Sequence, residues 1–443
     1  MDLNQRSNKG RTLLRKGDSV DSSAFIRLTF YIVFPGFFIY HFFVGKEYLP
    51  AIFGGYSTSI AVILLPFLCV AYVRDIRQNI HNFSLIEAGF LGFTGYFAAV
   101  VIIQVTWGAN LSASVQMFSV TLQFVAIFII VKLTDRESPK FKRSLMVFFI
   151  TLSGIIFLNV SEGAFFIASP DLQYSIEKIA DYQGYAFVYI VVTLYALTSL
   201  NSAVTRMFVY GAAVFALFLN GARAEFIGLL LVIPLIEFHL AKRKYLIIVI
   251  AISLLFAAAG LLSMSPEIMP ENRVLSLYTD YEIDGSVIER TRLLRAAWNT
   301  ITSHPLLGDF NSYDTGEWAH NALSAWVDLG LIGFLAYLGL LAGMIIGLLR
   351  RFPGCSKDPG YVLALSIACL VVLLAITAKS FTYQMLPVAV GLYARLVSRE
   401  KRTSVSMRKP AMPRDATRIR SVISQAIRKD ESHFVKNSGQ GQS

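Results

Sequence analysis

Residues 304–341 read HPLLGDFNSYDTGEWAHNALSAWVDLGLIGFLAYLGLL and pass from a polar, charged loop into a long apolar run. His320 and Asn321 are the last strongly polar side chains before that run, which only Asp328 then interrupts. An imidazole beside an amide at a membrane surface can handle protons and hydrogen-bond a substrate, although amphipathic side chains also gather there simply to anchor a helix. We interpret the rest of the chain as a scaffold around this junction.

The composition identifies the solvent in which the chain folds. Of its 443 residues, 55% are hydrophobic and only 16% are charged, and the mean hydropathy is +0.56. This is more apolar side chain than one globular core can bury. The composition therefore predicts an all-α polytopic membrane protein.

Twelve apolar runs are expected to cross the membrane as helices. They cover residues 25–44, 49–73, 85–105, 115–131, 145–160, 185–200, 207–219, 226–240, 246–264, 321–350, 361–377 and 381–396. The first run is too long for a cleaved signal and lacks a small-residue cleavage site, so we expect a retained anchor. The predicted organisation is a basic leader (1–23), a twelve-span transmembrane domain (24–396) and a basic, disordered tail (397–443).

The positive charge is concentrated at the two ends of the chain. Residues 397–443 contain eleven Lys and Arg against four Asp and Glu, and residues 1–23 contain five against three. Basic loops follow the second, fourth, eighth and tenth spans, on the same side as both ends. The positive-inside rule makes that side the cytoplasm, so residues 265–319 form a periplasmic loop. Anionic lipid suits the basic tail better than nucleic acid, because the tail lacks interleaved aromatic residues.

No motif in the sequence indicates metal or redox chemistry. The chain has no HExxH motif, and Cys69, Cys355 and Cys369 show no ligand or redox spacing. A GxSxG nucleophile motif is also absent. We therefore expect neither a metal nor a cofactor.

A short polar break separates two apolar runs at residues 217–231, which read LFLNGARAEFIGLLL. The predicted topology puts this break at the outer face. Arg223 there has a guanidinium fork that matches phosphate oxygens, next to a helix N-terminus that favours anions. Alternatively, Arg223 pairs with Glu225 or reaches lipid head groups. A substrate role is favoured because charges at a membrane edge are usually functional.

The outer loop contains a predicted amphipathic helix, GSVIERTRLLRAAWNTITSHPLLG (285–308), that ends before Pro305. Its expected apolar face comprises Val287, Leu294, Trp298 and Ile301. Three arginines lie on or near one other face and suit an anionic ligand or lipid head groups: Arg290, Arg292 and Arg295.

Two further charges fall within or beside apolar runs. Asp328 costs about 2.5–3.5 kcal/mol to insert on translocon scales, so we expect a structural partner on a neighbouring helix. Lys379, at the outer end of the eleventh run, is either an anchor or another phosphate contact.

Three motifs in this order resemble the O-antigen ligase and polymerase superfamily of bacterial inner-membrane glycan transferases. They are N-G-A-R-A-E (220–225), R-x-R-L-L-R-A-A-W-x-x-I-x-x-H-P-L-L-G (290–308) and A-H-N-A-L-x-x-W-V-D-L-G-L-I-G (319–333). The resemblance covers residues 185–341. The family usually has a second Gly close after H-P-L-L-G, where this chain has Asp309, Phe310 and Asn311.

The resemblance implies a GT-C-like, metal-independent transferase in the bacterial inner membrane. Its donor would be an undecaprenyl-diphosphate-linked glycan, and its acceptor either lipid A core or another lipid-linked glycan, with other polysaccharide-assembly proteins as possible partners. It matches Arg223 and Arg290 to the family's diphosphate-contacting arginines and His320 to its essential histidine. Asn321 beside it, Arg292, Arg295 and Lys379 are further candidate substrate contacts.

The expected chemistry is consistent with these residues. Guanidinium groups can stabilise a diphosphate leaving group, and a histidine that titrates near neutrality can act as the base. Glu225 is the reserve candidate for the base. A flippase or transporter of lipid-linked oligosaccharide, and a membrane scaffold for envelope assembly, are the alternatives. A transporter should place its charges near the bilayer midplane, whereas these gather at one face.

Overall fold

The structure is a computed structural model that describes residues 23–50, 56–78, 83–108, 110–161, 164–165, 182–241, 260, 274, 285–313 and 319–408. Side chains are described throughout these ranges except at 285–287 and 402–408. The chain divides into two compact units, Met1–Leu396 and Val397–Ser443, and the site lies in the first. The predicted leader, nearly all of the predicted run 246–264 and most of the tail lie outside the described residues.

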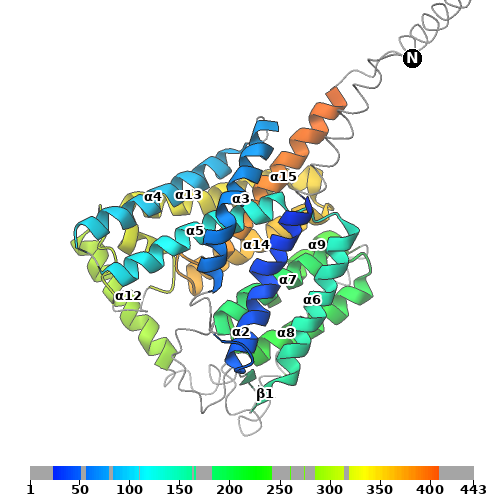
Figure 1. The fold of residues 1–443 in the computed structure, drawn as a ribbon, viewed down its shortest axis with the longest axis horizontal. Helices are drawn as coiled ribbons and strands as arrows, with labels where there is room; N and C mark the ends of the chain where they lie inside the picture. Colours follow the sequence, from blue (N-terminus) through cyan, green and yellow to red (C-terminus); the bar gives the residue numbers. More distant parts are fainter. Residues whose placement is uncertain are drawn as a thin grey trace, which may run out of the picture. The chain divides into compact units, whose positions relative to one another are not determined.

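Helices make up almost all of the described structure (Figure 1). After a helix that begins at Ser23, the elements are η1 (Ile32–Gly36), α2 (Phe37–Gly45), α3 (Tyr56–Gln78), α4 (Leu85–Thr106), α5 (Leu111–Leu133), α6 (Pro139–Leu158), β1 (Val160–Ser161), β2 (Ala164–Phe165), α7 (Tyr182–Thr198), α8 (Ala203–Asn220), α9 (Arg223–Leu240), α12 (Gly285–Ser303), α13 (Leu323–Cys355), α14 (Pro359–Thr377) and α15 (Met385–Arg408). The strands β1 and β2 form a short antiparallel pair.

Eight helices in the described part of the chain are long and apolar enough to cross a membrane. They are Ser23–Gly45, α3, α4, α5, α6, α8, α13 and α14. Helix α7 is apolar but has 17 residues, and α9 includes Arg223, Glu225 and Glu237. The chain is therefore an α-helical, multi-pass membrane protein. Helices occupy the predicted runs that the structure describes, and the run 246–264 lies almost wholly outside the described residues.

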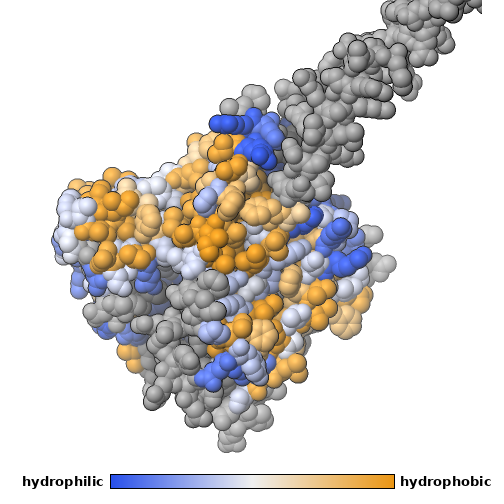
Figure 2. All heavy atoms as spheres, in the orientation of Figure 1, coloured by the Kyte–Doolittle hydropathy of each residue, from blue (hydrophilic) through white to orange (hydrophobic). Residues whose placement is uncertain are grey.

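Several of these helices expose apolar side chains on one face. On α3, Ile63, Phe67 and Val70 are all exposed and recur at helical spacing on one face. Figure 2 shows hydrophobic side chains over α3 and α4, with hydrophilic groups gathered at one end of α3. That end carries Arg74 and Arg77. Exposed apolar faces with charged ends are the pattern of helices embedded in a bilayer.

Helices α7 and α14 form the interior of this unit. All residues of α7 from Tyr185 to Thr198 are buried, and most of α14 is buried too. Both helices are apolar on every side, which is expected where other helices cover the whole circumference. Helix α14 packs on α9, α13 and α7. The α14–α15 connection, which follows its C-terminal end, therefore begins among these helices.

Helix α13 is interrupted rather than continuous. Its backbone leaves helical geometry at Gly330 (φ 68°, ψ −174°). The preceding loop supplies hydrogen-bond partners for the backbone groups that the break leaves unpaired. Asp309 N donates to Val327 O at 2.7 Å, and Leu331 N donates to Leu306 O at 3.1 Å. The apolar run that begins after Asn321, which only Asp328 interrupts in the sequence, gave no sign of this docking.

Two glycines allow the loop to approach the break. A Cβ on Gly308 would lie 2.3 Å from Val327 O, and one on Gly330 would lie 2.2 Å from Leu306 O. Asn311 also has a left-handed backbone (φ 59°), a conformation that Asn tolerates better than most residues.

Two sequence expectations for this region were wrong in detail. Asp328 accepts a hydrogen bond from Asn311 N at 3.2 Å, so its partner is the docked loop and not a neighbouring helix. Helix α12 forms as predicted, but it packs on α13 through Ala297 and Ile301, while Leu294 and Trp298 are exposed. The buried face of α12 runs through Leu293, Ala297 and Ile301, one residue away from the predicted positions Leu294 and Trp298.

Candidate functional site

The turn between α8 and α9 places an arginine and a glutamate at a helix N-terminus. Gly221 has a left-handed backbone and ends α8, and α9 begins at Arg223. Arg223 and Glu225 therefore lie in the first turn of α9, where backbone N–H groups and the helix dipole favour anions.

Both residues line a small space that we call the polar recess. Its free volume is about 20 Å³, room for roughly one water molecule. It is bordered by Tyr182, Gln183, Gly221, Arg223, Ala224, Glu225, Arg290, Ala378 and Lys379. A larger anion would thus be held at the mouth of the recess.

Lys379 is the cation that pairs with the buried Glu225. Its Nζ lies 2.7 Å from Glu225 Oε1 and donates to Gln183 Oε1. The same ammonium lies 4.9 Å from the ring centroid of Tyr383, whose hydroxyl donates to Glu225 Oε1 at 3.1 Å. Glu225 is thus a buried carboxylate whose Oε1 has two partners. This network holds the Lys379 side chain in one place.

His320 is held beside Lys379 by backbone contacts between α13 and α14. Ala322 N donates to Ala375 O at 2.6 Å, which ties the start of α13 to α14. The His320 imidazole is half-buried and hydrogen-bonds to the backbone of Ala378. Burial lowers the pKa of His320, with a smaller contribution from the positive charges of Arg290 and Lys379. The ring is therefore mostly neutral at pH 7 and can accept a proton.

A second space, the larger cavity, adjoins these groups. Its volume is about 250 Å³, and helices α2, α3, α5 and α7 surround it together with the α14–α15 connection. It is lined by Val33, Phe37, Ser57, Ala61, Gln123, Ala126, Ile127, Gln183, Gly184, Phe187, Val188, His320, Lys379, Ser380, Thr382, Tyr383 and Gln384. Lys379 and Gln183 border both spaces, so the polar recess and the larger cavity adjoin.

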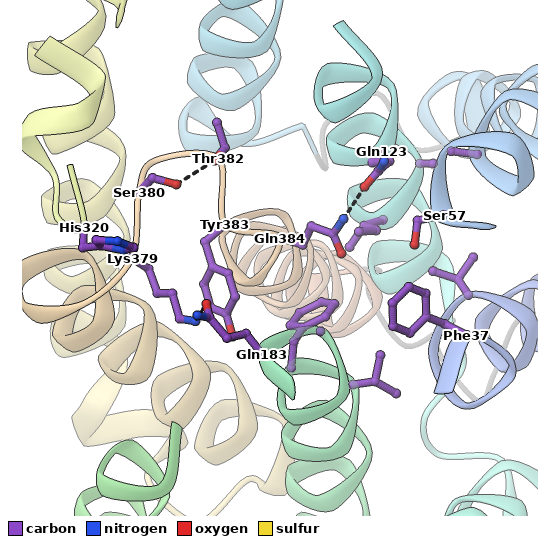
Figure 3. A pocket seen from close by; sticks show the side chains of 17 residues that line it. Phe37, Ser57, Gln123, Gln183, His320, Lys379, Ser380, Thr382, Tyr383 and Gln384 are labelled. Carbon is purple, nitrogen blue, oxygen red and sulfur yellow. Dashed lines mark hydrogen bonds between the residues drawn. The ribbon is translucent and has the colours of Figure 1, made fainter. Parts of the chain in front are cut away.

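The larger cavity has two chemically different ends (Figure 3). His320 and Lys379 form one end, which we call the cationic end. Gln123, Gln384 and Ser57 form the other, which we call the amide end. The Gln384 Nε2 atom donates to Gln123 Oε1, and Gln123 Nε2 donates to the Thr58 hydroxyl at 2.8 Å. A charged group and a neutral polar group can therefore be held at opposite ends.

Most of the residues predicted from the sequence meet at this place. The polar recess brings together Arg223, Glu225, Arg290 and Lys379 from three segments of the chain. His320 lines the adjoining cavity with Lys379. The structure thus brings five of the predicted site residues together around two adjoining spaces.

Three other candidates lie outside both spaces. Arg292 is exposed and pairs with Glu289 one turn away, and the Arg295 side chain is exposed. Asn321 Oδ1 accepts from Leu323 N at 2.9 Å, so its amide is engaged by the first residue of α13. None of the three lines the polar recess or the larger cavity.

Several site residues were missed by the sequence reasoning. Gln123 lies inside an apolar run, and an uncharged polar residue at such a position was a usable signal. Gln183, Tyr383 and Gln384 lie at helix ends, where polar residues are common and carry little information. Their importance follows only from the packing of α5, α7 and α15.

Within the described residues, no group of three His, Cys, Asp or Glu side chains is arranged to hold a metal ion. No model of a known protein family matches the chain, and a search of curated proteins finds no match. The functional interpretation therefore depends on the site and on the motifs in the sequence.

Proposed function

We propose that this protein is a glycosyltransferase of the O-antigen ligase and polymerase type. It takes a glycan from an undecaprenyl-diphosphate carrier and transfers it to a sugar hydroxyl on lipid A core or on another lipid-linked glycan. The reaction proceeds in the bacterial inner membrane, at its periplasmic face.

One observation carries the proposal. Arg223, Arg290 and Lys379 converge on the polar recess from α9, α12 and the α14–α15 connection, and Glu225 is the only acidic residue among the described residues that border it. Three cations around one carboxylate leave an excess of positive charge that suits a diphosphate. His320 lines the adjoining larger cavity together with Lys379, which borders both spaces.

The chemistry follows from these positions. The acceptor oxygen attacks the anomeric carbon of the donor sugar, and the bond from that carbon to the diphosphate oxygen breaks. Arg223 and Arg290 stabilise the charge that develops on the departing diphosphate. His320 takes the proton from the acceptor hydroxyl, which its lowered pKa permits at neutral pH. A single displacement of this kind inverts the anomeric configuration.

Glu225 has a positioning role in this scheme. Its Oε1 atom already binds Lys379 and Tyr383, and it borders the polar recess rather than the cavity that holds His320. A carboxylate held in this way is less suited to proton abstraction than the imidazole. Glu225 instead keeps Lys379 between the two spaces.

The orientation of the chain is part of the proposal. Both termini are cytoplasmic, and the loop that contains Ser312 is periplasmic. Ser312 is exposed, so Ser312→Cys in a background lacking Cys69, Cys355 and Cys369 provides a labelling site. An impermeant thiol reagent should label it in intact spheroplasts, and labelling only after membrane disruption would reverse the topology.

Product analysis of a deletion strain tests the function. Loss of a polymerase leaves single-repeat glycan, whereas loss of a ligase leaves long carrier-bound glycan that lacks lipid A. Purified protein in proteoliposomes should then transfer glycan from the accumulated lipid-linked donor to the acceptor without added metal. Movement of the donor across the bilayer without transfer would identify a flippase instead.

A further inference from the structure

We propose that the amide end of the larger cavity is a subsite for a neutral sugar ring, and that the substrate lies along the cavity with its diphosphate at the polar recess. This assignment depends on the proposed function. It adds the orientation of the substrate in the cavity and the chemical class of the bound sugar. The residues that recognise the ring are Gln123, Gln384 and Ser57.

The hydrogen-bonding capacity of the amide end is the first argument. Gln123 is buried and its amide is fixed between Gln384 and Thr58. Gln384 uses one N–H in this contact, and its Oε1 atom has no hydrogen-bond partner among the described residues. The Ser57 hydroxyl also lines the cavity without such a partner in the described structure. The wall thus offers neutral donors and acceptors, which match sugar hydroxyls.

The charge of the cavity is the second argument. Among its described lining residues, Lys379 is the only charged side chain, His320 is the only other basic group, and none is acidic. Both lie at the cationic end, away from the amide end (Figure 3). A charged sugar substituent at the amide end would lose its hydration without gaining an ionic partner, which is costly. The amide end therefore selects a neutral ring.

Aromatic side chains are the third argument. Phe37, Phe187 and Tyr383 border the same cavity, and the rings of Phe187 and Tyr383 lie 5.8 Å apart in an edge-to-face arrangement. Aromatic faces carry partial negative charge and attract the C–H groups on the apolar face of a sugar ring. A lipid chain would also contact these rings, but it would leave the Gln384 and Ser57 groups without partners.

Binding of paired probes to the purified protein tests the assignment. The probes are farnesyl diphosphate and the same lipid diphosphate bearing N-acetylglucosamine, with farnesol as the reference. Wild type should bind both diphosphates more tightly than farnesol and the sugar-bearing one most tightly. Gln384→Leu and Ser57→Ala should each reduce the advantage of the sugar-bearing probe about fivefold, the effect of one neutral hydrogen bond. Neither should change the affinity for farnesyl diphosphate.

A matched control and a second variant distinguish the outcomes. Gln116→Leu removes an exposed glutamine from the same helix as Gln123 and should leave all affinities unchanged. Arg223→Lys should weaken both diphosphates and preserve the ratio between them. An unchanged ratio in Gln384→Leu and Ser57→Ala, with diphosphate binding intact, overturns the sugar subsite alone. Equal affinity of wild type for farnesol and farnesyl diphosphate overturns the proposed function and this inference with it.

Discussion

The two ends of the α8–α9 hairpin carry similar side chains in different settings. Away from the turn, Arg206 Nη2 lies 2.8 Å from Glu237 Oε2, and the Tyr210 hydroxyl donates to Glu237 Oε1 at 2.7 Å. At the turn, Glu225 is equally buried and also has a cation and a tyrosine as partners. Each end therefore contains a buried glutamate with two matched partners.

The ends differ in what surrounds the pair. Arg206 is fully buried, and its Nη1 donates to Leu200 O at 3.1 Å, so the guanidinium is enclosed by protein. At the turn, Lys379 borders two open spaces, and Arg223 and Arg290 border one of them. A buried ion pair alone therefore does not identify a site. Adjoining space and an excess of one charge do.

The largest effect is expected from breaking the enclosed pair. Arg206→Met leaves Glu237 buried without its cation, which costs about 3–5 kcal/mol of stability. Unfolding in detergent should therefore occur at much lower temperature or denaturant concentration. The activity per folded molecule should change little, because Arg206 is remote from both spaces.

The double variant Arg206→Met/Glu237→Leu is the control for this effect. It removes both charges together and should recover most of the lost stability. Equal instability of the single and double variants would show that the pair contributes through packing rather than charge.

The next largest effect concerns His320 at the open end. His320→Ala should reduce turnover by about 10² to 10⁴ and leave donor binding and stability nearly unchanged, because a general base acts in the transition state. His320→Gln should retain much of the activity only if the residue merely orients the acceptor. Glycan transfer from purified donor, measured for wild type and both variants, decides between these roles. Full activity of the alanine variant would remove His320 from the mechanism.

Arg223→Lys should have a smaller but clear effect. Lysine keeps the positive charge and loses the two-pronged contact with diphosphate oxygens, at a cost of roughly 1–2 kcal/mol, or about tenfold in donor affinity. Arg143→Lys, at an exposed position on α6, is the control. Normal donor binding by a folded Arg223→Lys protein would make Arg223 a simple surface anchor.

The smallest effect is expected in the pH profile. Because the pKa of His320 lies below 6.5, kcat/KM should be constant near neutrality and fall as the pH drops through that lowered pKa and the base becomes protonated. The negative charge of Glu289 raises this pKa, so Glu289→Gln should move the acidic limb to lower pH. Glu137→Gln, which alters the Arg136 and Lys142 pair instead, should leave the limb in place. An acidic limb that stays in place in Glu289→Gln would show that a group other than His320 causes it.

The sequence by itself determined the class of the protein and most of its helices. Apolar runs of this length must bury their backbone polar groups in helices when they enter lipid, whatever their neighbours are. Local chemistry also placed Arg223 at the start of a helix, since Gly221 ends the preceding one. The amphipathic helix α12 was likewise predictable, although its buried face was not.

Only the tertiary structure decided which charges face an open space. Arg206, Arg223, Arg290 and Arg295 are equivalent as residue types, yet one is enclosed, two border the polar recess and one is exposed. The break at Gly330 was likewise decided by tertiary contacts, because the docked loop binds the backbone on both sides of it. Helix periodicity fixes the face on which a side chain lies, but the partner of that face is set by packing between segments distant in sequence.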